Sequence, residues 1–183
     1  MEQIRALTAA KKGSAAAFED LVAQHEKKIY NLCFSTMGNA EDAADMAQET
    51  LLKAWRALDR FDGRSSLGTW LYRIAMNTCL DELRRRRNRQ TVSIQALNEK
   101  GWEPEDGAGD MAERSAQGQQ LRQALALLPE DYRAVLVLRD VQGFTYEEIA
   151  QILHCPVGTV RSRLNRARKN MMKKLQDGEQ SLS

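Results

Sequence analysis

Residues 145–169 read TYEEIAQILHCPVGTVRSRLNRARK, and this stretch decides the fold of the C-terminal part of the chain. Thr145 and Glu148 have the spacing of a capping box, in which each side chain hydrogen-bonds the backbone amide of the other residue. A short turn at His154 follows, and Pro156 suits the first position of a new helix. Two short helices joined by a tight turn predict a helix-turn-helix.

The helix after this turn has one apolar side and one basic side. On a helical wheel the apolar side consists of Val157, Val160, Leu164, Ala167, Met171 and Leu175. In a helix-turn-helix the outer, N-terminal part of the second helix enters the major groove of DNA. The predicted contacts to base edges come from Thr159, Ser162, Arg163 and Arg166. The predicted contacts to phosphates come from Arg161, Lys169 and Lys173. A basic run alone is more often a solvated surface, and the capped helix before it is what favours DNA.

Composition excludes several classes of protein. The chain has 183 residues, of which 43% are hydrophobic and 28% charged, as in globular proteins with real cores. It contains no apolar run of the ~18–20 residues that span a membrane and no secretion signal, so we expect a cytoplasmic protein without membrane insertion. Cys33, Cys79 and Cys155 form no CxxC pair, which argues against a disulfide framework or a zinc site. Because no catalytic cluster or glycine-rich phosphate loop is present, we expect neither an enzyme nor a cofactor.

Helical periodicity dominates and period-2 alternation is absent, which predicts an all-α chain. The predicted helices cover residues 14–37, 40–58, 67–87, 121–128, 130–140, 145–153 and 156–175. Between the third and fourth lies an acidic, polar stretch that is typical of a linker. We therefore predict two small helical domains, 1–88 and 119–177, joined by a flexible linker at 89–118 and followed by a disordered tail at 178–183.

The predicted helix 40–58 has an acidic side with a leucine in its middle. If Ala47 faces the core, Leu52 lies on the opposite side, close to Glu41, Asp42, Asp45 and Glu49. Such a surface is either ordinary solvated surface or a docking site for a basic partner with Leu52 as its apolar anchor, and the sequence favours neither. DNA would be repelled here, so a partner at this surface would be a protein.

The predicted helix 67–87 is apolar on more than one side and keeps one polar row. That row consists of Asn77, Asp81, Arg84, Arg85 and Asn88. Asparagine and arginine suit base edges, and the arginine run at 84–87 suits phosphates. The row therefore indicates a second contact with DNA.

Three stretches together resemble the bacterial RNA polymerase sigma factors of the extracytoplasmic-function (ECF) type. They occur in the family's order, and only the linker and tail fall outside them. They are AEDAADMAQETLLKAWRAL at 40–58, FDGRSSLGTWLYRIAMNTCLDELRRRR at 61–87 and LPEDYRAVLVLRDVQGFTYEEIAQILHCPVGTVRSRLNRARKNM at 128–171.

The resemblance implies a factor that gives core RNA polymerase (its β′ and β subunits) specificity for promoter DNA. Docking on a β′ coiled coil is implied for Asp42, Asp45, Gln48, Glu49 and Leu52. Recognition and melting of the minus-10 element, with one base flipped into a loop pocket, are implied for Phe61, Asp62, Arg64, Ser65, Ser66, Asn77, Asp81, Arg84 and Arg85. Binding of the minus-35 duplex is implied for Thr159, Arg161, Ser162, Arg163, Arg166 and Lys169. The resemblance also implies regulation by an anti-sigma factor, which would hold the protein near the membrane.

The sequence departs from the family pattern at two places. His154 stands where a glycine is common, and the loop offers only Phe61 and Trp70 as aromatic residues for melting DNA. Two other interpretations are a dimeric helix-turn-helix regulator that binds palindromic duplex alone and a mimic that titrates an anti-sigma factor. The first leaves the acidic helix unused, and the second does not require the basic surfaces. We also expect the two domains to close on each other, or on an anti-sigma factor, until polymerase captures the chain.

Overall fold

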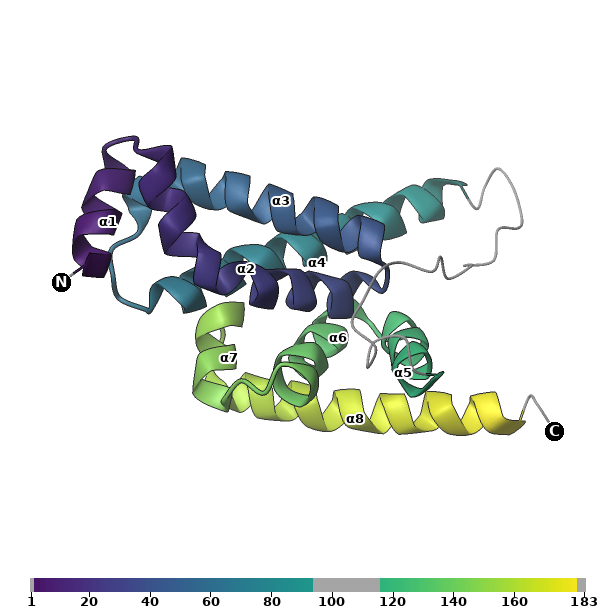
Figure 1. Cartoon of the computed structure of the whole chain (residues 1–183). Coiled ribbons are helices and arrows are strands. Elements are labelled where there is room, and N and C mark those ends of the chain that lie inside the picture. Colours follow the sequence, from purple (N-terminus) through teal and green to yellow (C-terminus); the bar gives the residue numbers. More distant parts are fainter. Residues whose placement is uncertain (1, 94–115, 181–183) are drawn as a thin grey trace.

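The computed structural model describes residues 2–93 and 116–180, and all regular elements in these ranges are helical (Figure 1). The N-terminal domain consists of α1 (Glu2–Lys11), α2 (Ala15–Met37), α3 (Ala40–Ala57), the 3₁₀ turn η1 (Leu58–Arg60) and α4 (Leu67–Ser93). The C-terminal domain consists of α5 (Ala116–Ala126), α6 (Glu130–Leu136), the π-helical turn η2 (Val137–Val141), α7 (Tyr146–Leu153) and α8 (Val157–Gln180). The predicted all-α fold with two helical domains is confirmed. Most of the predicted linker and the end of the tail lie outside the described residues.

The N-terminal domain is built around α2, which packs against α3 and α4. Ser14 begins this helix by accepting a hydrogen bond from the Ala17 amide at 3.3 Å, and Gly38 ends it in the left-handed region at φ 91°. Helix α1 was not predicted from the sequence. It buries Ala10, and the Lys11 ammonium donates to the Phe61 carbonyl at 2.7 Å, so α1 fixes the loop before α4.

The helix-turn-helix has the predicted capping box. The Thr145 amide donates to the Glu148 carboxylate at 2.8 Å, and the Glu148 amide donates to the Thr145 hydroxyl at 3.2 Å. The predicted core side of α8 is confirmed at Val160, Leu164 and Ala167, which are buried. It is wrong at Leu175, which is 47% exposed because the last turns of α8 extend beyond the other helices (Figure 1).

The predicted helix 130–140 is interrupted by the π-helical turn η2. There the Gln142 amide donates to the Val137 carbonyl at 2.9 Å, which is a five-residue step. The π-helical turn is followed by Gly143, whose φ of 76° reverses the direction of the chain. Phe144 comes next and is buried. The turn thereby directs Phe144 toward the other domain.

The two domains are in direct contact, with α4 against α6 and α7 and with α2 against α5 and η2. The ring of Phe144 lies 5.4 Å from that of Tyr72, and the Lys28 ammonium lies 4.1 Å from the centre of the Phe144 ring. The buried guanidinium of Arg133 donates to the Thr36 carbonyl at the end of α2 at 3.1 Å. The chain is therefore closed in this structure.

Candidate functional site

Four of the predicted docking residues form a continuous strip on the outer side of α3, which we call the acidic ridge: Asp45, Gln48, Glu49 and Leu52. Asp45 and Gln48 are exposed, and Leu52 is 44% exposed. Glu49 lies 3.8 Å from the Lys53 ammonium, and both side chains remain about 40% exposed. Exposed carboxylates around an exposed apolar residue suit a basic protein surface.

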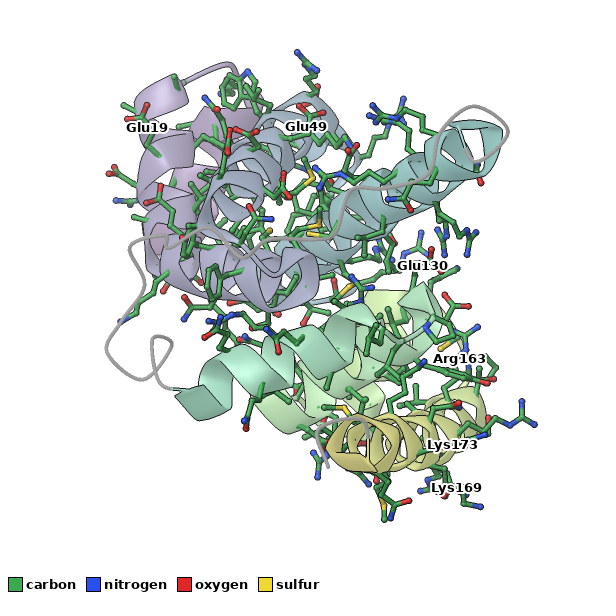
Figure 2. The ribbon with its side chains drawn as sticks, turned by 90° about the vertical axis from the view of Figure 1, so that its right-hand side faces the viewer. Glu19, Glu49, Glu130, Arg163, Lys169 and Lys173 are labelled. Carbon is green, nitrogen blue, oxygen red and sulfur yellow. The ribbon has the colours of Figure 1, made fainter. Side chains whose placement is uncertain are left out.

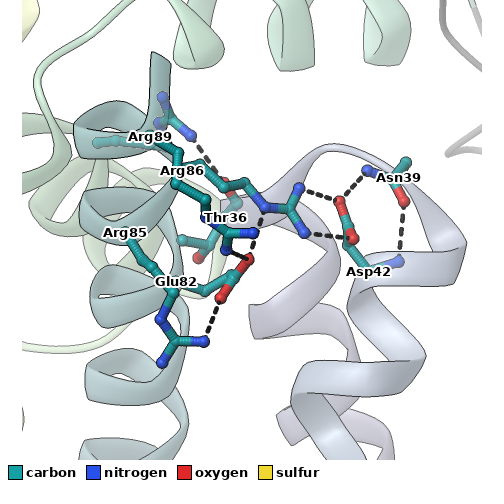
Figure 3. A network of polar contacts seen from close by, with 8 residues as sticks. Thr36, Asn39, Asp42, Glu82, Arg85, Arg86 and Arg89 are labelled. Carbon is teal, nitrogen blue, oxygen red and sulfur yellow. Dashed lines mark hydrogen bonds and ion pairs between the residues drawn. The ribbon is translucent and has the colours of Figure 1, made fainter. Parts of the chain in front are cut away.

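Asp42 does not share the exposure of this ridge. Its carboxylate accepts two hydrogen bonds from Arg86 of α4, at 2.6 and 2.7 Å, and a third from Asn39 at 2.6 Å (Figure 3). The bond from Arg86 is the main reason that the pKa of Asp42 lies below its usual value. Only 17% of the Asp42 side chain is exposed. Asp42 is therefore engaged in holding the start of α3 to α4, and its predicted docking role requires this pair to open.

A second carboxylate, that of Glu82, binds three arginines of α4. Glu82 accepts from Arg86 at 2.8 Å, from Arg85 at 3.0 Å and from Arg89 at 3.5 Å (Figure 3). The hydrogen bonds that Arg86 donates to the carboxylates of Asp42 and Glu82 raise the pKa of Arg86. Arg86 therefore stays charged, while Arg85 and Arg89 keep about two thirds of their side-chain surface exposed.

The loop before α4 forms one wall of a polar cavity. Phe61 is buried and its ring lies 5.2 Å from that of Trp70, so in this structure it supports the loop and does not face solvent. Asp62 accepts bonds from the backbone and side chain of Arg64, and the backbone bond is the main reason that its pKa is lowered. Ser66 caps α4 by accepting from the Thr69 amide at 3.0 Å.

The cavity has a volume of about 400 Å³ and both domains line it. The loop and α4 contribute Arg60, Asp62, Arg64, Ser65, Thr69, Trp70 and Arg73. The helix-turn-helix contributes Gln151 and His154, and His154 adopts the left-handed region at φ 52° and ψ 51°. Cations, hydroxyls and an indole ring together suit a nucleotide, and the turn of the C-terminal domain covers them here.

The predicted minus-10 residues do not all face one surface. Asp62, Arg64 and Ser65 line the cavity, whereas Asp81 and Arg85 line a groove between α3 and α4 together with residues of the acidic ridge. Asn77 is exposed on α4. Arg84 points to the other domain, because its Nη2 atom lies 3.4 Å from the Asp131 carboxylate. The structure therefore brings the loop residues together and separates the residues of α4.

The predicted minus-35 residues lie along α8. Arg161, Ser162, Arg166 and Lys169 are exposed, and Thr159 and Arg163 are partly buried. Figure 2 shows Arg163, Lys169 and Lys173 along this helix. The guanidinium of Arg163 lies 3.8 Å from Asp131, so one of the predicted base contacts is held by a carboxylate.

Glu130 and Asp131, at the start of α6, were not predicted as functional residues. Glu130 lies 2.8 Å from Arg87 of α4, and Asp131 lies near both Arg84 and Arg163. In the sequence they follow Pro129 at a helix start, where acids are expected for their effect on the helix dipole alone. Nothing in the sequence indicates that Arg84 and Arg87 of the other domain are their partners.

Among the described residues, no group of histidine, cysteine and acidic side chains has the arrangement of a metal site. No helix in the described ranges has the length and hydropathy needed to cross a membrane.

Comparison with known proteins assigns the two halves separately. The family Sigma-70 region 2 matches residues 21–89, and the family Sigma-70, region 4 matches residues 118–171. The RNA polymerase sigma-H factor of Pseudomonas aeruginosa is 40% identical over 172 residues, covering 90% of this chain and 89% of that protein. The ECF RNA polymerase sigma-E factor of Escherichia coli K12 is 40% identical over 172 residues, covering 90% of each chain. The ECF RNA polymerase sigma factor SigW of Bacillus subtilis is 34% identical over 178 residues, covering 91% and 93%.

Two solved structures have a similar fold. The sigma factor RpoE in complex with the anti-sigma factor NepR, from Bartonella quintana, superimposes with a TM-score of 0.65 at 29% identity, covering 87% of this chain and 96% of that one. CnrH in complex with the cytosolic domain of CnrY gives a TM-score of 0.67 at 26% identity, covering 97% and 99%. With both regions matched, in this order, and with relatives similar over nearly their whole length, the chain belongs to the family of ECF RNA polymerase sigma factors.

Proposed function

We propose that this chain is a transcription initiation factor, without catalysis of its own, that directs core RNA polymerase to promoters and helps to separate the DNA strands. One observation carries the proposal: the acidic ridge, the loop cavity and the basic surface of α8 lie on one chain whose two halves match sigma regions 2 and 4. A dimeric helix-turn-helix regulator would use only the last of these three surfaces.

Each surface receives one task in this proposal. The acidic ridge binds a basic surface of polymerase, and Leu52 fills an apolar site on it. The loop cavity receives a flipped base of the minus-10 element, since contacts made only with the extruded base offset the cost of unstacking. The exposed residues of α8 bind the minus-35 duplex, and Arg161 and Lys169 hold phosphates.

Regulation by an anti-sigma factor, in the cytoplasm, is part of the proposal. The sigma factor RpoE of Bartonella quintana, whose structure is similar, is bound to the anti-sigma factor NepR. The closed arrangement supports a second level of control. Gln151 and His154 cover the cavity, and Asp131 of the C-terminal domain holds Arg84 of α4, so the proposed minus-10 surface is partly occupied while the domains touch. Polymerase must therefore separate the domains before promoter DNA can bind.

The test is binding of purified core RNA polymerase to the tagged chain and to two ridge variants. Leu52→Asp and Glu49→Lys should each weaken binding at least about tenfold, because a buried anchor or a complementary charge is lost. Asp59→Lys, an equal change at an exposed residue of η1, should bind as the wild type does. Undiminished binding of both ridge variants would move the polymerase site elsewhere on the chain.

A further inference from the structure

The loop cavity is complete only while the two domains are closed. One wall consists of the loop before α4 and the first turns of α4, and the other wall consists of Gln151 of α7 and His154. Helix α7 packs directly against α4, which holds the two walls together (Figure 1). The volume of about 400 Å³ lies within the ~300–1,000 Å³ that is typical of small-molecule sites. The closed chain therefore has a site of ligand size that neither domain forms alone.

The described lining of this cavity has an excess of positive charge. Arg60, Arg64 and Arg73 contribute three guanidinium groups, and Asp62 contributes the one carboxylate among the described lining residues. Arg64 donates hydrogen bonds to Asp62 from its backbone amide and its guanidinium, so the charge of this carboxylate is offset. The guanidinium groups of Arg60 and Arg73 form no hydrogen bond or ion pair with another described residue. Two cations therefore remain available to bind an anion here.

The other lining residues suit an aromatic ring with polar edges. The indole of Trp70 forms part of the wall, and the ring of Phe61 supports it at 5.2 Å. Ser65 and Thr69 contribute hydroxyl groups. The side-chain amide of Gln151 has a donor and an acceptor side by side, the pattern that pairs with the edge of a purine base. Since guanidinium groups bind phosphates, the complete set matches a purine nucleotide that carries several phosphates.

His154 is held at this cavity at an energetic cost. It is the one described residue other than glycine with a positive φ, at φ 52° and ψ 51°. A glycine would adopt this conformation without strain. Strained residues are concentrated at ligand-binding and other functional sites, where the side chain has a use. In this cavity the imidazole can donate a hydrogen bond to a phosphate or ribose oxygen.

We infer that the closed chain binds a purine nucleoside polyphosphate in this cavity, with its phosphates on Arg60 and Arg73 and its base against Trp70 and Gln151. This binding requires neither polymerase nor promoter DNA and does not depend on the proposed function. A ligand that contacts both domains binds only the closed chain and shifts the population toward it. The ligand also fills the cavity proposed for the flipped base and so opposes strand separation, a consequence that rests on the proposed function.

The experiment is a calorimetric titration of the purified full-length chain with ATP and, separately, with inorganic triphosphate. We expect one ATP per chain, bound at least about tenfold more tightly than triphosphate, because only ATP has a base to contact Trp70 and Gln151. Arg60→Gln and Gln151→Ala, one exposed residue in each domain, should each raise the Kd for ATP at least about fivefold.

Two variants are the matched controls, Arg56→Gln on α3 and Gln123→Ala on α5. Both residues are exposed and neither lines the cavity, so each substitution should change the Kd for ATP less than about twofold. Thermal unfolding without ATP should be the same for all four variants, which shows that a loss of binding is not a loss of fold.

Each result supports or overturns the inference. Weaker binding in Arg60→Gln and Gln151→Ala, with wild-type affinity in both controls, supports the site. Wild-type affinity in Gln151→Ala overturns its position between the domains, and equal affinity for ATP and triphosphate overturns the assignment to a nucleotide. An equal loss in Arg56→Gln and Arg60→Gln reduces the effect to net charge, and no binding at millimolar ATP ends the inference. Because polymerase is absent, all of these results leave the ridge test of the proposed function untouched.

Discussion

Asp131 lies 3.4 Å from the guanidinium of Arg84, across the boundary between the two domains. Its other carboxylate oxygen lies 3.8 Å from Arg163 of α8. One acidic residue therefore contacts an arginine proposed to bind the minus-10 element and an arginine proposed to bind the minus-35 element. A carboxylate in this position occupies both arginines as a phosphate would.

Asp131→Asn should increase the affinity of the free chain for minus-35 duplex. Exposed ion pairs contribute ~0.2–1 kcal/mol each, so the loss of two predicts a gain in affinity of between about twofold and about thirtyfold. The measurement is a fluorescence anisotropy titration at low salt, where such pairs are least screened.

Asp140→Asn is the control for this experiment, because Asp140 pairs with Arg168 inside the C-terminal domain at 2.7 Å. An equal gain in both variants would show that only net charge matters and that the contact between the domains does not restrain DNA binding.

Arg86→Gln should destabilise the N-terminal domain. The substitution removes two hydrogen bonds to Asp42 and one to Glu82. Hydrogen bonds to charged groups contribute ~1.5–3 kcal/mol each to stability when they are shielded from water. Because about 40% of the Arg86 side chain is exposed, we expect a loss nearer ~1–2 kcal/mol in urea denaturation at pH 7.

The loss of stability caused by Arg86→Gln should become smaller as the pH falls. The Arg86 guanidinium holds the pKa of Asp42 below its ordinary 3.8, so the pair stabilises the fold above that value. The stabilisation is lost as the pH falls through the folded-state pKa of Asp42. The difference between wild type and Arg86→Gln should therefore be full at pH 7 and shrink below about pH 4. A difference that grew on acidification would assign the stability to another group.

His154→Gly should stabilise the C-terminal domain. His154 caps α7 in the left-handed region, which costs a residue with a side chain ~1–2 kcal/mol and costs glycine little. Allowing for the greater freedom of glycine in the unfolded chain, we expect a gain of about 0.5–1 kcal/mol in the free energy of unfolding. If thermal denaturation shows a loss, the His154 side chain contributes more across the cavity than the backbone strain costs.

Arg166→Ala should weaken minus-35 recognition by ~1–3 kcal/mol at one base pair if its exposed guanidinium contacts a base through two hydrogen bonds. The measurement compares the Kd of the polymerase complex for a set of single-base variants of the minus-35 element. An equal loss for every sequence would make Arg166 a phosphate contact.

Local features of the fold were predictable from the sequence because their causes are local. Thr145 and Glu148 are three residues apart, and the capping box they predict is present. Leu52 was expected on the outer side of α3 from its position on the wheel, and it is exposed. Helix α1 was missed because its packed side consists mainly of small residues, Ala6 and Ala10 beside Leu7, which give a weak hydrophobic pattern. The η2 turn was missed because residues 130–140 have helical periodicity throughout.

The contacts between distant segments were not predictable. The wheel placed Asp42 with the other acids of α3, and it cannot show that Arg86, forty-four residues later, reaches this carboxylate. Arg133 looks like a surface residue of α6, yet its guanidinium is buried on the carbonyls of Thr36, Ala126 and Leu128. Such partners are set by how the helices pack, and helical periodicity carries no information about the packing of one helix on another.

The most direct test of the account is transcription in a purified system. Core RNA polymerase, with and without the chain, is supplied with genomic DNA fragments, and the 5′ ends of the transcripts are mapped. We predict a small set of discrete start sites that require the chain, share sequence near positions minus-10 and minus-35, and disappear with Leu52→Asp. Start sites that are unchanged by the chain, together with tight binding of palindromic duplex by the chain alone, would contradict the account and indicate an ordinary helix-turn-helix regulator.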